Sequence, residues 1–211
     1  MRCVAMADLH GQLPPSSMMP MGDILLLGGD LCPTSNHSPK FQAHWLDTTF
    51  RKWLETMPYQ WIVGVAGNHD FVFQERPDLV PNLPWTYLQD RGCECDGIRV
   101  YGSPWQPIFY DWSFNLDEQG LKQKWALIPD NIQVLLLHGP PYGYGDLTAR
   151  GERVGSQSLT DRIQQIRPAL VVCGHIHPAY GMYMLEATTV LNAAFVNEQY
   201  IPTNPPLVFD L

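Results

Sequence analysis

Short runs of apolar residues alternate along the chain with longer polar segments. Five runs are rich in Val, Ile and Leu and end in clusters of Gly, Asp, Asn or His. They read RCVAMAD, DILLLGGD, WIVGVAGNHD, IQVLLLHG and ALVVCGHIH, at residues 2–8, 23–30, 61–70, 132–139 and 169–177. Short apolar runs with polar exits are typical of buried strands. The pattern predicts five strands of a largely parallel sheet, each followed by polar side chains.

The intervening segments carry helical periodicity. Residues 38–57 place apolar side chains at spacings that fit one helical face, and Ser38 with Pro39 marks a plausible start. Residues 116–128 and 158–166 are weaker helix candidates, and the segments 180–196 and 205–211 favour short antiparallel strands. Alternating strands and helices predict an α/β fold. We expect one domain over residues 1–211, with a mixed sheet or β-sandwich flanked by helices.

Composition narrows the classes of partner. The 211 residues include 13 Lys and Arg against 21 Asp and Glu, and the resulting net charge of −8 disfavours polymeric nucleic acid as a ligand. We find no signal-peptide pattern and no apolar run long enough for a membrane span, so we expect a cytoplasmic protein with no membrane partner. Five scattered cysteines are expected to be free thiols, and Cys93 with Cys95 lacks the nearby partners of a zinc site.

Polar residues at the ends of the predicted strands carry the candidate chemistry. They are Asp8, His10, Asp30, Asn68, His69, His138, His175 and His177, which include five of the seven histidines. The other two, His37 and His44, are expected to have no function. Ligands collect outside the carboxyl ends of parallel strands, and strand alternation would point Asp8 with His10, and His175 with His177, into one cleft. Mixed imidazole, carboxylate and amide ligands suit Mn, Fe or Zn better than Ca²⁺.

These residues resemble the ordered signature of the calcineurin-like metallophosphoesterases, which is D-x-H, GD, GNH[DE], a later H, and GHxH. All five blocks occur here in order, from Asp8 to His177. The surrounding HGPPYGYGD, GERVGS, GHIHPAYG and PTNPPLVFDL resemble the branch of the brain-type (239FB) metallophosphoesterase-domain proteins and their bacterial relatives. Some vertebrate members have Gly at the position of His175. The resemblance implies a four-layer α/β/β/α sandwich of mixed sheets flanked by helices.

The resemblance also implies a site with two divalent metal ions, of which manganese is the expected choice and Fe or Zn the alternatives. Asp30 would bridge the ions. Asp8, His10 and His177 would complete the first metal site, and Asn68, His138 and His175 the second. His69 is expected to stabilise or protonate the leaving oxygen, and Asp70 either orients His69 or serves as a turn residue. The attacking group would be a water that bridges the metals and has lost a proton.

The implied activity is hydrolysis of small phosphodiesters, with 2′,3′- or 3′,5′-cyclic nucleotides as the expected substrates. Phosphatases of the same family that act on monoesters use arginines near the GD and GNH blocks. Here GGDLCPTSNHS contains no arginine, and Phe71 follows GNHD. Possible substrate contacts are Trp105, Tyr144, Arg150 and Arg153. The alternatives are a broad phosphomonoesterase, a DNA or RNA nuclease, and a weakly active nucleotide-binding module, and the oligomeric state stays open.

Overall fold

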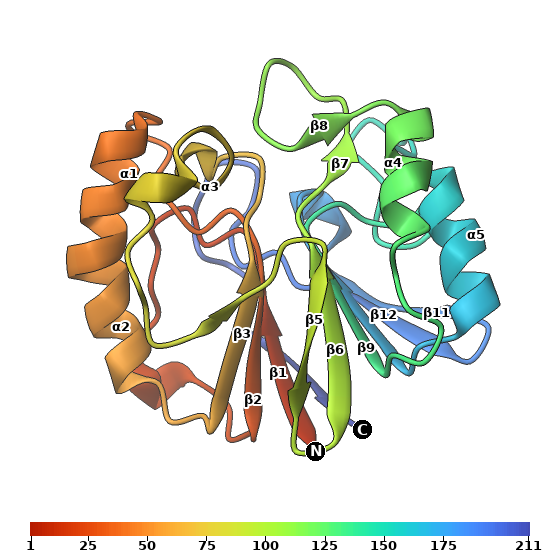
Figure 1. Ribbon diagram of the computed structural model, residues 1–211, viewed down its shortest axis with the longest axis horizontal. Helices are drawn as coiled ribbons and strands as arrows, with labels where there is room; N and C mark the ends of the chain where they lie inside the picture. The colour runs from red at the N-terminus through yellow and green to blue at the C-terminus, as the bar shows by residue number, and fades with distance from the viewer.

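The computed structural model describes residues 1–211 and arranges them in four layers, with two sheets face to face and helices on both outer sides (Figure 1). Four strands of the first sheet are parallel, and β13 pairs antiparallel with β1 at its edge. In spatial order these strands are β13 (Leu207–Asp210), β1 (Arg2–Met6), β2 (Ile24–Gly28), β3 (Trp61–Val65) and β4 (Thr86–Tyr87).

The second sheet has four parallel strands in its middle and one antiparallel strand at each edge. Its spatial order is β11 (Gly181–Leu185), β12 (Thr188–Asn192), β10 (Leu170–Cys173), β9 (Val134–Leu137), β6 (Ile98–Ser103) and β5 (Arg91–Cys95). A small two-stranded sheet, β7 (Gln106–Pro107) with β8 (Asn115–Leu116), stands above it in Figure 1.

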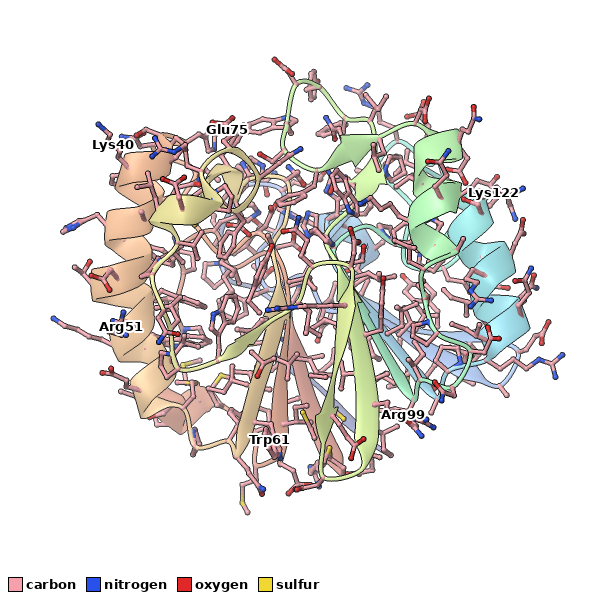
Figure 2. The ribbon with its side chains drawn as sticks, in the orientation of Figure 1. Lys40, Arg51, Trp61, Glu75, Arg99 and Lys122 are labelled. Carbon is pink, nitrogen blue, oxygen red and sulfur yellow. The ribbon has the colours of Figure 1, made fainter.

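Helices cover the outer face of each sheet. The first sheet is covered by one helical stretch made of α1 (Pro39–Trp45), the π-helical turn η2 (Leu46–Phe50) and α2 (Arg51–Thr56). The second is covered by α4 (Glu118–Trp125) and α5 (Gln157–Ile166). The remaining short elements are α3 (Phe71–Glu75) and the 3₁₀ turns η1 (Ser16–Met18), η3 (Pro77–Leu79) and η4 (His177–Ala179). Lys40, Arg51 and Lys122 extend away from the sheets into solvent (Figure 2).

The apolar strand residues are buried on both faces of each sheet. In β2, Leu25 and Leu27 pack in the cluster under the α1–α2 helix, whereas Ile24 and Leu26 pack in the cluster between the two sheets. A strand that is covered on both sides needs apolar residues at consecutive positions, because alternate residues face opposite layers. This requirement explains the uninterrupted VIL-rich runs.

The expected fold class is confirmed, and so are the main helices. Ser38 caps α1 by accepting a hydrogen bond from the Phe41 amide at 3.4 Å, and Pro39 is the first helical residue, as expected. All five cysteines are free thiols. The apolar pattern predicts no strand at the CEC segment, but Cys93 and Cys95 lie in β5, which pairs with β6. No helix has the length and apolarity that a membrane span requires.

Most strands of both sheets present their carboxyl ends at the same end of the sandwich, opposite the chain termini (Figure 1). The two sheets are joined there, since the Ala7 amide donates to the Ala193 carbonyl and the Phe195 amide donates to the Ala7 carbonyl, both at 2.8 Å. The loops that follow the parallel strands of both sheets therefore meet above the sandwich.

The layer between the sheets predicts a stability difference between two leucines. Leu26→Ala should lower the free energy of unfolding by about 2–5 kcal/mol, because it leaves a cavity between two sheets that cannot close on it. The control Leu127→Ala, at an exposed leucine, should change it by less than about 0.5 kcal/mol. Urea denaturation of the two variants measures the difference, and equal losses would contradict this packing.

Candidate metal centre

Asp8 and His10 stand in a turn that begins after β1 ends at Met6. Both residues have left-handed backbones, with φ of 53° and 45°. Their amides are held by the neighbouring loop: Asp8 donates to the Gly29 carbonyl at 2.9 Å and His10 to the Asp30 carbonyl at 2.8 Å. The expectation that strand alternation pairs these two side chains was wrong, because the strand has already ended and the turn brings them together.

The same correction applies to His175 and His177. Strand β10 ends at Cys173, His175 has φ of 67°, and His177 begins the 3₁₀ turn η4. The His175 amide donates to both carboxylate oxygens of Asp8, at 3.0 and 2.9 Å. Asp8 therefore ties the end of β1 to the end of β10, across the two sheets.

Asp30 lies at the centre of the cluster and is also left-handed, with φ of 52°. Its Oδ2 is 3.6 Å from His10 Nε2 and 4.0 Å from His69 Nε2, and its Oδ1 is 3.6 Å from His138 Nε2. The His69 amide donates to Oδ1 at 2.7 Å, which fixes the carboxylate. Asp30 thus has histidines from both sheets around it, in the central place expected for a bridge.

The remaining predicted ligands gather on either side of Asp30. Asn68 Oδ1 lies 2.8 Å from His138 Nε2 and 2.7 Å from His175 Nδ1. On the other side, His177 Nε2 is 3.5 Å from Asp8 Oδ1 and 3.3 Å from His10 Nε2. The structure therefore brings all seven residues of the predicted ligand set into one cluster, with Asn68, His138 and His175 on one side of Asp30 and Asp8, His10 and His177 on the other.

Backbone carbonyls orient two of the imidazoles. His138 Nδ1 lies 2.9 Å from the Gly28 carbonyl, and His177 Nδ1 lies 3.0 Å from the Asn197 carbonyl. A carbonyl can only accept, so each Nδ1 donates its proton there, and Nε2 is the nitrogen that faces the cluster. This is the orientation that a metal ion requires of an Nε2 ligand.

Two glycines allow the loops to approach this closely. A Cβ on Gly67 would lie 2.2 Å from Asp30 Oδ1, and a Cβ on Gly174 would lie 2.2 Å from Asp8 Oδ2. No side chain is tolerated at such distances without displacing the carboxylate. The glycines that precede Asn68 and His175 in the GNHD and GHIH motifs are therefore required by the packing of the cluster itself.

Burial shifts the protonation of the cluster strongly. Burial raises the pKa of Asp8, but His177 and the other imidazoles outweigh it and hold that pKa below its ordinary value. Burial lowers the pKa of His177, yet the Asp8 carboxylate more than reverses this and raises it to about 8. Burial raises the pKa of Asp30 to about 8, against the opposing charge of His69, and lowers that of His175 to about 3.

The donor set fits divalent metal ions. Asp8 and Asp30 are almost completely buried, and their only ion-pair partners are imidazoles, with no lysine or arginine among them. Buried carboxylates need positive charge close by. Ligand atoms on one ion lie roughly 3.0–3.4 Å apart when each is about 2.1 Å from it, close to the separations of 3.3–3.6 Å across this cluster. Three overlapping groups have ligand atoms that all lie within 4.8 Å of one another: Asp8–His10–His177, His10–Asp30–His69 and Asp8–Asp30–His138.

His69 has its two ring nitrogens in different surroundings. Nε2 faces Asp30, whereas Nδ1 lies 3.1 Å from His37 Nε2. The ring packs against Trp112 with centroids 4.2 Å apart, and Gln42 donates to the His69 carbonyl at 2.6 Å. His37, for which the sequence suggested no function, is therefore a direct neighbour of the candidate acid.

Asp70 holds backbone and does not contact the His69 ring. Its carboxylate accepts hydrogen bonds from the amides of Leu31, Cys32 and Gly67, at 2.8–3.1 Å. These amides belong to the loops that carry Asp30 and Asn68. Of the two roles expected for Asp70, the structure does not support a direct contact that orients the His69 ring, because the hydrogen bonds of its carboxylate brace the two loops.

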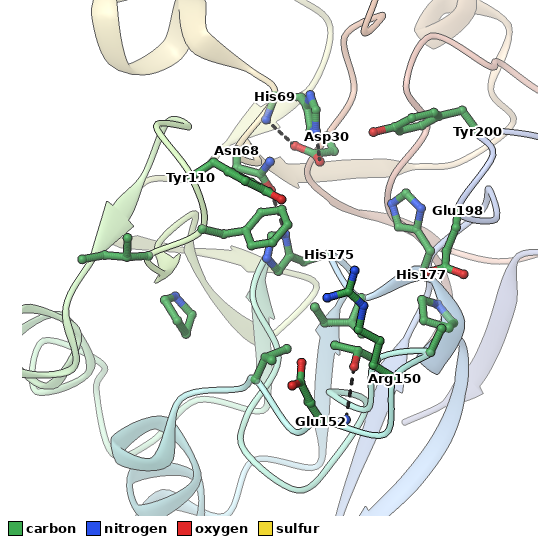
Figure 3. A pocket seen from close by; sticks show the side chains of 18 residues that line it. Asp30, Asn68, His69, Tyr110, Arg150, Glu152, His175, His177, Glu198 and Tyr200 are labelled. Carbon is green, nitrogen blue, oxygen red and sulfur yellow. Dashed lines mark hydrogen bonds and ion pairs between the residues drawn. The ribbon is translucent and has the colours of Figure 1, made fainter.

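A cavity of about 530 Å³ opens above the cluster (Figure 3). Its floor exposes Asp30, Asn68, His69, His175 and His177, while Asp8, His10 and His138 lie beneath. Arg150 lines the wall, as proposed from the sequence, and is the only lysine or arginine that does so. Glu152, Glu198 and Tyr200 line it too. Signals for the two glutamates and Tyr200 were absent from the sequence, because they come from loops without a recognisable motif.

Three of the suggested substrate contacts lie outside this cavity. Trp105 donates from Nε1 to Asp90 at 3.0 Å and packs edge-on against the buried Phe114. Tyr144 packs against the core under α4 and α5. Arg153 pairs with the buried Asp146 at 2.7 Å. Each of these side chains is committed to packing or to an ion pair, so the structure does not support their role in binding substrate.

Comparison with known proteins agrees with the motifs. Residues 1–179 match the family described as Calcineurin-like phosphoesterase. Metallophosphoesterase domain-containing protein 1 of Homo sapiens is 35% identical over 238 residues, which cover 100% of this chain and 71% of that protein. The UPF0046 protein T07D4.2 of Caenorhabditis elegans is 33% identical over 245 residues, which cover 100% of this chain and 60% of that protein.

Solved structures agree at the level of the fold. Phosphopantetheinyl hydrolase (PptH) from Mycobacterium tuberculosis superimposes with a TM-score of 0.55 at 13% identity, over 94% of this chain and 90% of that one. The 5′-nucleotidase precursor from Thermus thermophilus gives a TM-score of 0.53 at 13% identity, over 91% of this chain and 48% of that one. The family expected from the five sequence blocks is confirmed, and this chain belongs to the calcineurin-like phosphoesterases.

Proposed function

We propose that this chain is a dinuclear-metal phosphodiesterase that hydrolyses small phosphodiesters, with 2′,3′- or 3′,5′-cyclic nucleotides as the preferred class. The observation that carries the proposal is the convergence of six further predicted ligand side chains around the buried Asp30, at the floor of a cavity of about 530 Å³. Cavities of this size take one small organic molecule rather than a polymer.

We assign one metal ion to Asp8, His10 and His177, the other to Asn68, His138 and His175, and the shared place to Asp30. Two divalent ions, when bound, supply Lewis acidity: they attract phosphoryl oxygens and lower the pKa of water at the site to about 7. Manganese is our preferred metal and Fe or Zn are the alternatives, because mixed imidazole, carboxylate and amide donors suit these three metals better than Ca²⁺. The chain's own contribution is to hold the donors in place through the Gly28 and Asn197 carbonyls.

His69 is our candidate for the acid that protonates the leaving oxygen. Its Nε2 faces the floor of the cavity, 4.0 Å from Asp30 Oδ2, and its Nδ1 is held by His37 at 3.1 Å. Trp112 covers one side of the ring. The ring is thereby fixed with one nitrogen toward the substrate, which is what a general acid needs.

The charge of the cavity wall favours a diester. Arg150 is the one guanidinium that lines the cavity, and Glu152 and Glu198 stand on the same walls. A monoester dianion needs more positive charge than a diester monoanion, and paired arginines are the strong way to supply it. The two glutamates and the net charge of −8 also oppose binding of a nucleic-acid polymer.

The free cysteines accord with the reducing cytoplasm, which we propose as the compartment.

The ligand set predicts an absolute metal requirement. Exhaustive chelation should abolish hydrolysis of bis(p-nitrophenyl) phosphate, and addition of Mn²⁺ should restore most of it. Elemental analysis of the same samples gives the metal content. Full turnover by protein that contains no metal would refute the proposed mechanism.

Variants at Asp30 and at His69 should lose different properties, metal binding in the first case and proton transfer in the second. Asp30→Asn should weaken both metal sites, because one carboxylate serves two ions. His69→Ala should keep the metals and lower kcat by about 10²- to 10⁴-fold, the usual contribution of a general acid.

Metal content and kcat are to be measured on both variants, with His44→Ala as the control at an exposed histidine in α1. A loss of metal in His69→Ala equal to that in Asp30→Asn would make His69 a ligand, which the His10–Asp30–His69 grouping also permits geometrically.

The single free guanidinium predicts a preference between ester classes. With Mn²⁺ bound, kcat/KM should be higher for bis(p-nitrophenyl) phosphate than for p-nitrophenyl phosphate, and 2′,3′- and 3′,5′-cyclic AMP should be hydrolysed. A clear preference for the monoester at equal metal content would instead support the broad phosphomonoesterase. Binding of cyclic AMP without turnover would support the nucleotide-binding module, and cleavage of a DNA or RNA oligomer in preference to cyclic AMP would support the nuclease.

A further inference from the structure

Three consecutive apolar residues stand exposed at the rim of the cavity. Ile108, Phe109 and Tyr110 line it, and their exposed fractions are 64%, 50% and 77%. They lie in the loop between β7 and β8, residues 108–114, which rises above the second sheet in Figure 1. Exposed apolar side chains that gather beside a polar cleft are typical of a ligand-binding surface.

The backbone of this loop is held firmly from inside. The Asn115 side chain accepts from the Phe109 amide at 3.3 Å and donates to the Phe109 and Tyr110 carbonyls at 3.2 and 3.0 Å. The buried Gln106 donates to Asn115 at 3.0 Å. Tyr110 itself has a left-handed backbone, with φ of 51°, a conformation that is unfavourable for a non-glycine residue. The fold therefore maintains an outward display of these rings at an energetic cost.

The aromatic rings of this loop contact a residue of the candidate metal centre. Phe109 packs perpendicular to the His175 imidazole, with centroids 5.8 Å apart, and its ring contacts Tyr110 edge-to-face at 4.5 Å. A phosphodiester bound at the metals would extend its organic group along these rings. Arg150, Glu152 and Glu198 enter the same cavity from other loops (Figure 3).

We propose that Phe109 and Tyr110, whose rings lie 70° apart, form an aromatic platform that binds the nucleobase of the substrate, with one ring stacked on the base and the other in edge contact with it, and so determine specificity for nucleotide diesters. The proposal rests on the proposed phosphodiesterase function. A planar aromatic group suits the two rings better than an alkyl chain, because the other walls carry Arg150, Glu152 and Glu198, whose charged groups pair with the polar edges of a base. Base–aromatic stacking tolerates any base, so the platform would select nucleotides as a class.

This assignment places on Phe109 and Tyr110 the aromatic substrate contact that the sequence suggested for Trp105 and Tyr144. Trp105 is engaged on both sides, since Lys124 lies over its ring at 4.4 Å and Phe114 packs against it at 5.4 Å. Phe109 and Tyr110 line the cavity and remain exposed, and nothing in their sequence context distinguished them. Their role follows from the position of the loop relative to His175.

The test compares two substrates with the same leaving group. Thymidine 5′-(p-nitrophenyl phosphate) carries a base, and methyl p-nitrophenyl phosphate does not. In Phe109→Ala and Tyr110→Ala, the ratio of kcat/KM for the thymidine ester to that for the methyl ester should fall by about 5- to 100-fold, the range that loss of one stacked base produces. Tyr142→Ala, at an exposed tyrosine outside the cavity, is the control and should leave the ratio unchanged.

Conservative variants separate stacking from apolar contact. Tyr110→Phe should keep the ratio, whereas Phe109→Leu and Tyr110→Leu should lose most of it. Near-ultraviolet circular dichroism of each variant checks that the loop change has not altered the fold. A ratio that stays constant in both alanine variants, or that falls equally in the leucine and phenylalanine variants, would overturn the platform.

A binding measurement keeps this proposal separate from the proposed function. Calorimetry with the Mn²⁺-loaded protein compares AMP with inorganic phosphate. The alanine variants should weaken AMP by about 5- to 100-fold and phosphate by less than about 2-fold. If neither ester is hydrolysed but AMP binding falls selectively, the platform stands and the phosphodiesterase assignment fails. If AMP and phosphate weaken equally, or AMP does not bind, the platform is refuted.

Discussion

The burial of two carboxylates without a lysine or arginine partner is the constraint on which the upper end of the molecule depends. Asp8 and Asp30 lie where the two sheets meet, and imidazoles from loops of both sheets surround them. A buried anion is costly unless positive charge lies beside it. The imidazoles around Asp8 and Asp30 offset only part of the cost of burying these carboxylates. Their ring nitrogens are also donors for metal cations, which would supply the remaining positive charge. The cluster is thus both the centre of the proposed chemistry and the point at which the two sheets are connected.

Backbone strain is concentrated at this same place. Asp8, His10, Asp30 and His175 all have left-handed backbones, and such conformations cost about 1–3 kcal/mol each in non-glycine residues. The sandwich below supplies the rigidity that holds them, because its strands are buried on both faces and cannot shift to relieve the turns. Asp70 adds to this by binding the amides of the Asp30 and Asn68 loops together. The result is a preorganised donor set that does not rely on one flexible loop.

In the proposed function, the metal centre binds the phosphoryl group and the cavity wall selects the rest of the substrate. The centre consists of motif residues and can serve any phosphoester, since it reads only the phosphoryl group. The wall consists of Phe109, Tyr110, Arg150, Glu152 and Glu198, which differ in charge and shape. The proposed selectivity for a diester over a monoester, and for a nucleotide over a simple alkyl ester, would therefore reside in loops that no metal-binding motif includes.

The sequence by itself determined the layered α/β fold, the main strands and helices, and the identity of the seven predicted ligands. The strands were readable because a strand buried on both faces needs consecutive apolar residues, and the seven ligands were identified because the residues after these strands resemble the ordered signature of the family. The helical stretch Pro39–Thr56 was equally predictable, from its Ser38 cap and its apolar face.

Only the tertiary structure decided how those ligands meet and what surrounds them. Left-handed turns, not strand alternation, pair Asp8 with His10, and such turns leave little trace in a sequence without glycine at those positions. The partnership of His37 with His69 and the display of Phe109 and Tyr110 join segments that are far apart along the chain. Contacts of this kind are set by the relative placement of whole loops on two sheets, and local residue patterns do not encode that placement.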